Sequence, residues 1–333
     1  MTDRLTALLA QREWLLADGA TGTNLFAMGL TSGDSPELWN AVHPDRTQTL
    51  HRAFVDAGSD IILSNSFGAN RRRLGLRGLG ARAKALSQLA AQNARAIADR
   101  AGRPVVVAGS VGPTGEMLAP LGSLSEDEAT EIFVEQIEGL RNGGVDVVWI
   151  ETMSALEEAR AAARAAIAVG APYTATASFD TAGRTMMGLA PAVFARAFED
   201  LTPPPLAVGA NCGVGAADLV VSVLAMTEAD PDAIVIAKAN AGLPQWRDGH
   251  LHYSGSPELM QRYIALAIDA GARIVGGCCG NTPAHVAAMR RALDRHQRGP
   301  RPDLAAIEAA LGKLVAPAAA KGAGRRRRSR EGA

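Results

Sequence analysis

Residues 272–283 read Ala-Arg-Ile-Val-Gly-Gly-Cys-Cys-Gly-Asn-Thr-Pro, and this stretch decides the fold. A short apolar run leads into a glycine-rich turn, and a proline follows at a position suited to the first turn of a helix. The run predicts a buried strand, and proline has the backbone angle that a helix start needs. The stretch therefore predicts one strand–turn–helix unit with two adjacent cysteines in its turn.

Seven similar apolar runs precede this unit, separated by Ala-rich amphipathic segments. Most are continuously apolar, which is typical of parallel strands buried on both faces. Eight alternations of strand and helix predict a (β/α)8 barrel, and they favour it over the alternative, a doubly wound open sheet. The predicted strands are residues 14–17, 60–64, 104–108, 145–150, 173–177, 206–210, 233–237 and 273–275.

The boundaries of the barrel follow from the same patterns. We expect one barrel over residues 5–298, a C-terminal helix within 299–315 and a disordered basic tail over 316–333. Two long loops, residues 21–40 and 239–257, follow the first and seventh strands and are candidate lids or partner surfaces.

One helix start carries a specific signal. Ser125-Glu126-Asp127-Glu128 is read as a capping box, in which the Ser125 hydroxyl and the Glu128 carboxylate each bind an unpaired backbone N–H. It predicts a helix over residues 125–142.

Composition excludes several classes of protein. The net charge of the 333-residue chain is zero, which argues against a general nucleic-acid-binding protein. No apolar run is long enough for a membrane-spanning helix, and residues 1–11 lack the apolar segment of a signal peptide. Three cysteines, two of them adjacent, make a poor disulfide framework. We therefore expect a cytoplasmic protein in a reducing compartment.

All three cysteines stand where a predicted strand meets a turn. Cys212 closes the sixth apolar run, and Cys278 and Cys279 follow the eighth. Three thiolates with an open fourth position suit a catalytic zinc ion, and Cys212 is too distant from the pair for a zinc finger. The alternative is a non-catalytic protein whose cysteines only bind zinc or are simply buried. The glycines on both sides of the pair favour a metal site.

Other polar side chains also end predicted strands. Because active sites of barrels lie at the carboxyl ends of their strands, these are catalytic or binding candidates. The two carboxylates, Asp18 and Glu151, are expected to face the thiols and to hold an ammonium group while the metal holds a sulfur. The remaining candidates are Asn65 and Ser110, predicted to contact the substrate, and Lys238 and Asn240, which receive no role.

The motifs and their order resemble the homocysteine S-methyltransferase family, over residues 15–293. Within that family the chain is most similar to the homocysteine domain of cobalamin-dependent methionine synthase, and next to betaine–homocysteine methyltransferase. The motifs are Asp18-Gly19-Ala20-Thr21-Gly22-Thr23, Asn65-Ser66-Phe67-Gly68-Ala69-Asn70, Gly112-Pro113-Thr114-Gly115-Glu116, Glu151-Thr152, Asn211-Cys212, Asn240-Ala241-Gly242 and Gly276-Gly277-Cys278-Cys279-Gly280.

The resemblance implies a (β/α)8 barrel with one zinc ion per chain on Cys212, Cys278 and Cys279. It also implies that the ammonium group of homocysteine lies near Asp18 and Glu151. Zinc deprotonates a thiol that coordinates to it, and the thiolate is the nucleophile that takes the methyl group to form methionine.

The resemblance leaves more than one methyl donor open. A methylcorrinoid held by a separate protein is favoured, with betaine or another onium donor as the alternative. Betaine enzymes carry an aromatic residue where this chain has Gly68, because an aromatic cage replaces the hydration of a quaternary ammonium group. The aromatic residues that could compensate are Trp39, Phe67 and Trp246.

Overall fold

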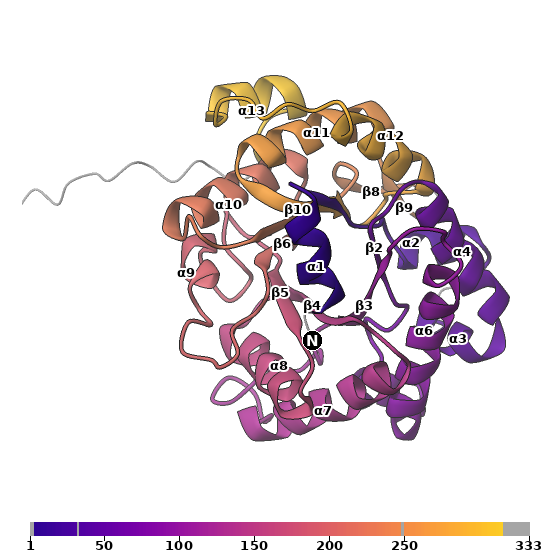
Figure 1. The fold of residues 1–333 in the computed structure, drawn as a ribbon. Helices are drawn as coiled ribbons and strands as arrows, with labels where there is room; N and C mark the ends of the chain where they lie inside the picture. Colours follow the sequence, from indigo (N-terminus) through magenta and orange to yellow (C-terminus); the bar gives the residue numbers. More distant parts are fainter. Residues whose placement is uncertain (1–2, 32, 248–249, 316–333) are drawn as a thin grey trace, which may run out of the picture.

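The computed structural model describes residues 3–31, 33–247 and 250–315. Its main sheet contains eight parallel strands in the order β1-β10-β7-β6-β5-β4-β3-β2 (Figure 1). The strands are β1 (Leu15–Leu16), β2 (Ile61–Leu63), β3 (Val106–Val111), β4 (Val147–Met153), β5 (Tyr173–Ala177), β6 (Val208–Cys212), β7 (Val235–Ala239) and β10 (Ala272–Gly277).

The first and last strands of that order meet and close the sheet. Ala17 forms a parallel bridge with Ile61, and the N–H of Asp60 donates to the carbonyl of Leu16 at 2.7 Å. An open sheet would leave both of these edges unpaired. The predicted (β/α)8 barrel is therefore confirmed, with a strand at each of the eight predicted places.

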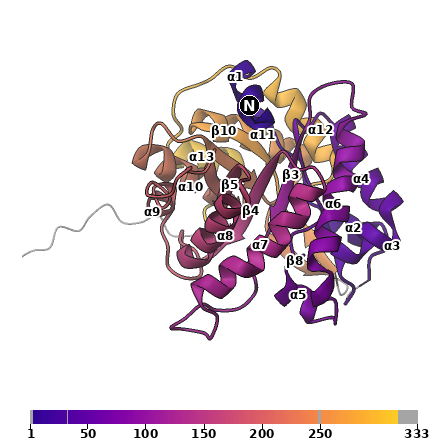
Figure 2. The same ribbon diagram turned by 60° about the horizontal axis from the view of Figure 1, so that its bottom comes forward.

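Helices surround the barrel on its outer face, and Figure 2 shows α6, α7 and α8 along β3, β4 and β5. The helices that follow the barrel strands are α4 (Pro44–Asp56), α6 (Ala83–Ala98), α7 (Glu126–Asn142), α8 (Leu156–Val169), α9 (Pro191–Ala195), α10 (Ala216–Ala229), α11 (Pro257–Asp269) and α12 (Pro283–Leu293). Shorter or peripheral ones are α1 (Arg4–Gln11), α2 (Gly22–Ala27), η1 (Pro36–Leu38), α3 (Trp39–Val42), α5 (Arg71–Gly75), η2 (Gly80–Arg82) and α13 (Leu304–Leu311).

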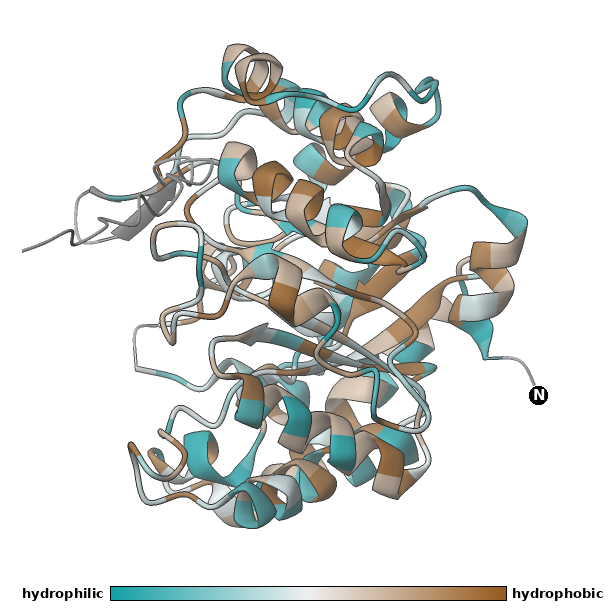
Figure 3. Ribbon diagram, turned by 90° about the vertical axis from the view of Figure 1, so that its left-hand side faces the viewer, coloured by the Kyte–Doolittle hydropathy of each residue, from teal (hydrophilic) through white to brown (hydrophobic). Residues whose placement is uncertain are grey.

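The alternation of side chains along the strands divides the core into an inner and an outer part. On β4, Val147 and Trp149 pack inside the barrel, whereas Val148 and Ile150 pack against the helices. Leu5 and the rest of the apolar face of α1 join the inner part, so α1 plugs the N-terminal end of the barrel. In Figure 3 the apolar strands run through the middle of the molecule. The opposite, C-terminal end is left for the site.

Two loop and capping details differ from expectation. Ser125 caps α7, accepting from the N–H of Glu128 at 3.1 Å, but the Glu128 carboxylate pairs with Arg72 instead of returning to the cap. The reciprocal half of the predicted capping box is therefore wrong, because the arginine offers a charged partner. The loop after β7 forms an antiparallel hairpin, β8 (Pro244–Arg247) and β9 (His250–Tyr253), which was not predicted.

Helix α13 lies within the predicted C-terminal helical segment, and the predicted tail, residues 316–333, lies outside the described residues. Among the helices of the described ranges, none combines the length and apolarity needed to cross a bilayer.

Candidate active site

The three cysteine sulfurs meet at the C-terminal end of the barrel. Cys212 is the last residue of β6, and Cys278 and Cys279 directly follow β10. The Sγ atom of Cys212 lies 3.4 Å from that of Cys278 and 3.6 Å from that of Cys279. All three sulfurs lie within 4.8 Å of one another, which makes them a possible ligand set for one metal ion.

The backbone is shaped to bring these sulfurs together. Cys212 has a φ of 62°, a left-handed conformation that a side chain other than glycine adopts only at an energetic cost. Strict alternation along β6 would turn this side chain outward with Val208 and Ala210, which pack against the helices. The left-handed residue breaks that alternation at the strand end, where the sulfur joins the other two.

The glycine before the cysteine pair leaves room for a buried asparagine. A Cβ atom on Gly277 would lie 2.4 Å from Cγ of Asn281, so only glycine fits. The Asn281 amide donates to the carbonyl of Ala239 at 2.9 Å and to that of Cys278 at 3.1 Å. The turn is therefore anchored to β7. A capping box between Thr282 and His285 then starts α12.

Asn211 supports the cluster from β6. Its side-chain oxygen accepts from the N–H of Thr152 at 2.8 Å and from the hydroxyl of Thr176 at 2.6 Å. Its amide nitrogen contacts the sulfur of Cys278 at 3.8 Å. Thr152, like Cys212, has a φ of 62°, so one asparagine links two strained strand ends. Asn211 stands in the Asn211-Cys212 motif, which by itself assigns it no role.

The protonation of the sulfurs is strongly coupled. Contacts from the sulfurs of Cys278 and Cys279 raise the pKa of Cys212, and burial adds to the effect. Contacts from Cys212 and Cys278 lower the pKa of Cys279 to about 3. One thiolate is therefore stabilised by its thiol neighbours, whereas three adjacent thiolates require a cation between them.

Glu151 projects into the barrel above this core, two residues beyond Trp149 on the inner side of β4. Its side chain is buried, with 8% of the residue exposed, and it accepts a hydrogen bond from the hydroxyl of Ser110. Burial raises the pKa of Glu151 to about 7, and the ammonium of Lys238 opposes that rise.

Asp18 lies in a buried ion pair. Its Oδ1 atom accepts from Nζ of Lys238 at 2.8 Å, and its Oδ2 atom accepts from the N–H of Leu63 at 2.7 Å. Burial raises the pKa of Asp18, and the ammonium of Lys238 opposes the rise. Lys238 is on the inner side of β7, two residues beyond Ile236, which packs inside the barrel. That spacing was visible in the sequence, but the partner was not.

A cavity of about 360 Å³ opens over these groups. Asp18 is not part of its wall but lies behind Lys238 with 1% exposure. Asn65 anchors the wall, because its amide nitrogen donates to the carbonyl of Pro36 at 2.7 Å. The predicted residues that the fold brings to this cavity are Asn65, Ser110, Glu151, Cys212, Cys278 and Cys279, and Lys238 and Tyr253 join them.

The aromatic residues that could form a cage for an onium donor differ in where they lie relative to the cavity. Phe67 lines the cavity, whereas Trp39 is buried beside His43, with ring centroids 5.2 Å apart. The side chain of Trp246 lies outside what the structure describes. At Gly68 an added Cβ atom would lie 2.8 Å from Oε1 of Glu37, whose carboxylate accepts from the Gly68 N–H at 2.8 Å. A carboxylate thus adjoins the position where betaine enzymes carry an aromatic ring.

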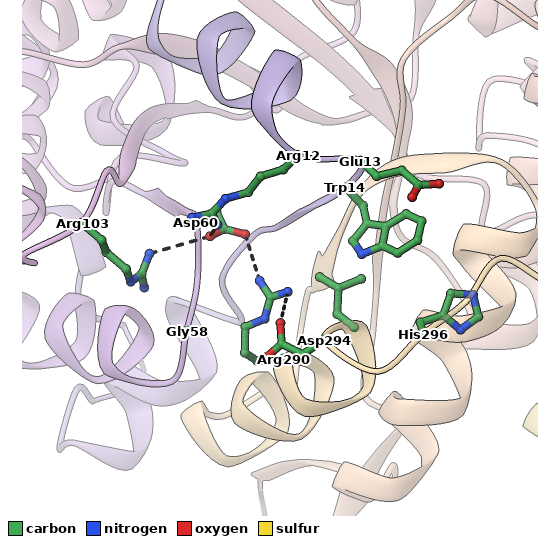
Figure 4. A pocket seen from close by; sticks show the side chains of 10 residues that line it. Arg12, Glu13, Trp14, Gly58, Asp60, Arg103, Arg290, Asp294 and His296 are labelled. Carbon is green, nitrogen blue, oxygen red and sulfur yellow. Dashed lines mark hydrogen bonds and ion pairs between the residues drawn. The ribbon is translucent and has the colours of Figure 1, made fainter.

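A second cavity, of about 550 Å³, lies at the N-terminal end of the barrel (Figure 4). Its centre is the buried carboxylate of Asp60, which pairs with Arg12, Arg103 and Arg290. The same carboxylate accepts from the N–H of Leu16 at 2.9 Å and so ties β1 to the start of β2. This end of a barrel concerns stability, and the cluster closes the sheet there.

The sequence of this chain is similar to those of known methyltransferases. The model of a family described as homocysteine S-methyltransferase matches residues 15–293. The methionine synthase of Mycobacterium tuberculosis is 32% identical over 310 residues, which cover 88% of this chain and 26% of that protein. The methionine synthase of Mycobacterium leprae is 31% identical, covering 89% and 25%. The chain thus spans about a quarter of the length of these curated relatives.

The fold is also similar to solved structures of a homocysteine methyltransferase. The oxidized and metallated forms of the homocysteine methyltransferase MmuM from Escherichia coli are each 26% identical, with TM-scores of 0.71 and 0.70. Both alignments cover 87% of this chain and 99% of that one. The chain therefore belongs to the homocysteine S-methyltransferase family of methyltransferases, as its motifs predicted.

Proposed function

We propose that the chain transfers a methyl group to the sulfur of homocysteine, forming methionine, at a zinc ion held by Cys212, Cys278 and Cys279. The observation that carries the proposal is the convergence of the three sulfurs beside the cavity that Glu151 also lines. A structural cluster of thiols would not need an adjoining cavity with a buried carboxylate.

The sulfur geometry fits the proposed ion. Two thiolates on a tetrahedral zinc ion, each about 2.3 Å from it, are separated by about 3.8 Å. The separations of 3.4 and 3.6 Å, with all three sulfurs within 4.8 Å, need only small adjustments. When bound, zinc would convert the substrate thiol to a nucleophilic thiolate at neutral pH.

The chain's own residues would bind and orient the amino acid. Glu151 in the cavity wall, and Asp18 behind Lys238, would supply negative charge near the substrate ammonium group. Ser110 holds the Glu151 side chain in place by donating its hydroxyl hydrogen. Asn65 keeps the cavity wall fixed through Pro36. Fixing the amino acid this way aligns its sulfur with an incoming methyl group, which supplies rate by proximity.

For the donor, we propose a methylcorrinoid carried by a separate protein. The identity with methionine synthases supports it, as does the carboxylate of Glu37 beside Gly68 in place of an aromatic ring. A free onium donor is the second candidate. Phe67 in the cavity wall favours it, and so does the near-complete coverage of a separate homocysteine methyltransferase chain.

A donor screen tests both candidates. Zinc-loaded protein would be incubated with L-homocysteine and, separately, a methylcorrinoid protein, betaine or S-methylmethionine, with methionine measured by mass spectrometry. Methionine from the methylcorrinoid protein alone is the expected result. Methionine from betaine or S-methylmethionine would transfer the assignment to the second candidate. No methionine from any of the three would overturn the proposed function.

A further inference from the structure

Lys238 is a buried cation inside the proposed amino-acid site. Only 1% of this residue is exposed, and its Nζ atom lies 5.9 Å from the centroid of the Trp149 ring. Burial alone would lower the pKa of Lys238, but the carboxylates of Asp18 and Glu151 outweigh that effect and raise it. The lysine is therefore charged, and it pairs at 2.8 Å with Asp18, one of the two carboxylates expected to bind the substrate.

The two carboxylates differ in the partners that their oxygen atoms already bind. Asp18 uses one oxygen for Lys238 and the other for the N–H of Leu63. Glu151 accepts the hydroxyl of Ser110, an uncharged donor, and it lines the cavity. A substrate ammonium group that enters the cavity thus meets a Glu151 carboxyl group that is hydrogen-bonded to the uncharged Ser110 hydroxyl, whereas the ammonium of Lys238 pairs with Asp18.

The net charge of Asp18, Glu151 and Lys238 points the same way. When both carboxyl groups are ionised, Asp18 and Glu151 carry two negative charges, and Lys238 contributes one positive charge. The remaining single negative charge matches the single ammonium group of an amino acid. Without the lysine, two buried carboxylates would compete for one ammonium group, which would then settle in more than one position.

We propose that Lys238 is a positioning residue that neutralises Asp18 and leaves Glu151 as the carboxylate that receives the substrate ammonium group. This inference rests on the proposed function and narrows it, because Asp18 then acts through Lys238 and not on the substrate. A buried pair of this kind is costly to break on one side only, since the other charge remains without its partner.

A pair of variants tests the inference. In Asp18→Asn, the freed ammonium of Lys238 turns to Glu151 and competes with the substrate. In Asp18→Asn/Lys238→Met, both charges are gone and Glu151 is free again. Calorimetric titration of zinc-loaded protein with L-homocysteine under reducing conditions should show a dissociation constant raised about tenfold or more in the single variant. The double variant should return to within about threefold of the wild type. If it does not fold, Asp18→Asn/Lys238→Gln replaces it.

Each result decides between named alternatives. A double variant that binds as weakly as Asp18→Asn would mean that Asp18 itself holds the ammonium group, and Lys238 would lose the role. A single variant that melts earlier but binds normally would make the ion pair purely structural. Arg95→Met is the matched control, because it removes an ion pair to Asp146 (3.0 Å) far from the cavity. It should lower the melting temperature and leave binding unchanged.

Homocysteine binding by the wild type distinguishes a failure of the proposed function from a failure of the role proposed for Lys238. If the zinc-loaded wild type does not bind homocysteine, the proposed function fails and the role of Lys238 fails with it. If the wild type binds but the double variant does not recover, only the role of Lys238 is overturned.

Discussion

The sulfur atoms of Cys212 and Cys278 lie 3.4 Å apart although the residues are 66 positions apart in the chain. They come from β6 and the end of β10, with β7 between them in the sheet. The barrel therefore brings together thiols that no local motif could bring into contact. The proposed zinc ion should be lost when any one of them is removed.

Cys279→Ser should reduce the zinc content from about one ion per chain to a small fraction of that, because a neutral hydroxyl replaces a thiolate ligand. Elemental analysis of protein purified under reducing conditions measures it. Glu151→Gln serves as the control, since it leaves all three sulfurs in place and should retain the metal. An unchanged zinc content in Cys279→Ser would show that the cysteines are not the ligands.

Glu151→Gln should raise the Michaelis constant for homocysteine by roughly ten- to a hundredfold, because a hydrogen bond to a charged group contributes about 1.5–3 kcal/mol. Steady-state kinetics with the donor found in the screen provides the measurement.

Glu158→Gln is the matched control for this prediction. Glu158 is also buried, but it accepts from Thr114 at 2.6 and 2.8 Å and does not line the cavity. It should affect the melting temperature and not the Michaelis constant. Equal constants in Glu151→Gln and the wild type would remove Glu151 from the substrate site.

Stability should depend on pH through the same carboxylate. Burial raises the pKa of Glu151 from 4.5 to about 7, so the folded protein keeps a proton that the unfolded chain releases. Its contribution to stability is therefore greatest below pH 4.5 and is lost as the pH rises toward 7. At 1.36 kcal/mol per pH unit, the loss is about 3 kcal/mol.

Urea unfolding of metal-free wild type and Glu151→Gln between pH 4 and 8 would measure this contribution. The free energy of unfolding of the wild type should fall relative to that of the variant across the interval. Parallel curves would mean that Glu151 titrates alike in the folded and unfolded states.

Gly277→Ala should destabilise the protein by about 1–3 kcal/mol and weaken metal binding, because the new methyl group would overlap Asn281. Thermal unfolding and zinc titration measure the two effects. Gly75→Ala, at the end of α5, is the control. Its Cβ atom would meet nothing within 4 Å, so stability should be unchanged or rise by up to about 1 kcal/mol. Equal behaviour of the two variants would refute the packing argument.

The sequence by itself determined the barrel and much of its site. Continuous apolar runs predict parallel strands that are buried on both faces. The carboxyl ends of such strands lie at the same end of a closed barrel, so Cys212, Cys278 and Glu151 could be expected to meet there. Glu151 was expected at that face only because it ends the fourth apolar run; its place on the inner side of β4, two residues beyond Trp149, comes from the structure. The apolar runs and their ends are local or periodic properties, and a sequence displays them directly.

Only the tertiary structure decided how those side chains are paired. The partner of Asp18 is Lys238, 220 positions away, and no local pattern connects the two residues. The left-handed backbone of Cys212 is likewise held by surrounding strands rather than preferred by its own sequence. Ion pairs and strained conformations depend on which distant groups the closed barrel brings into contact, so they appear only once the chain has folded.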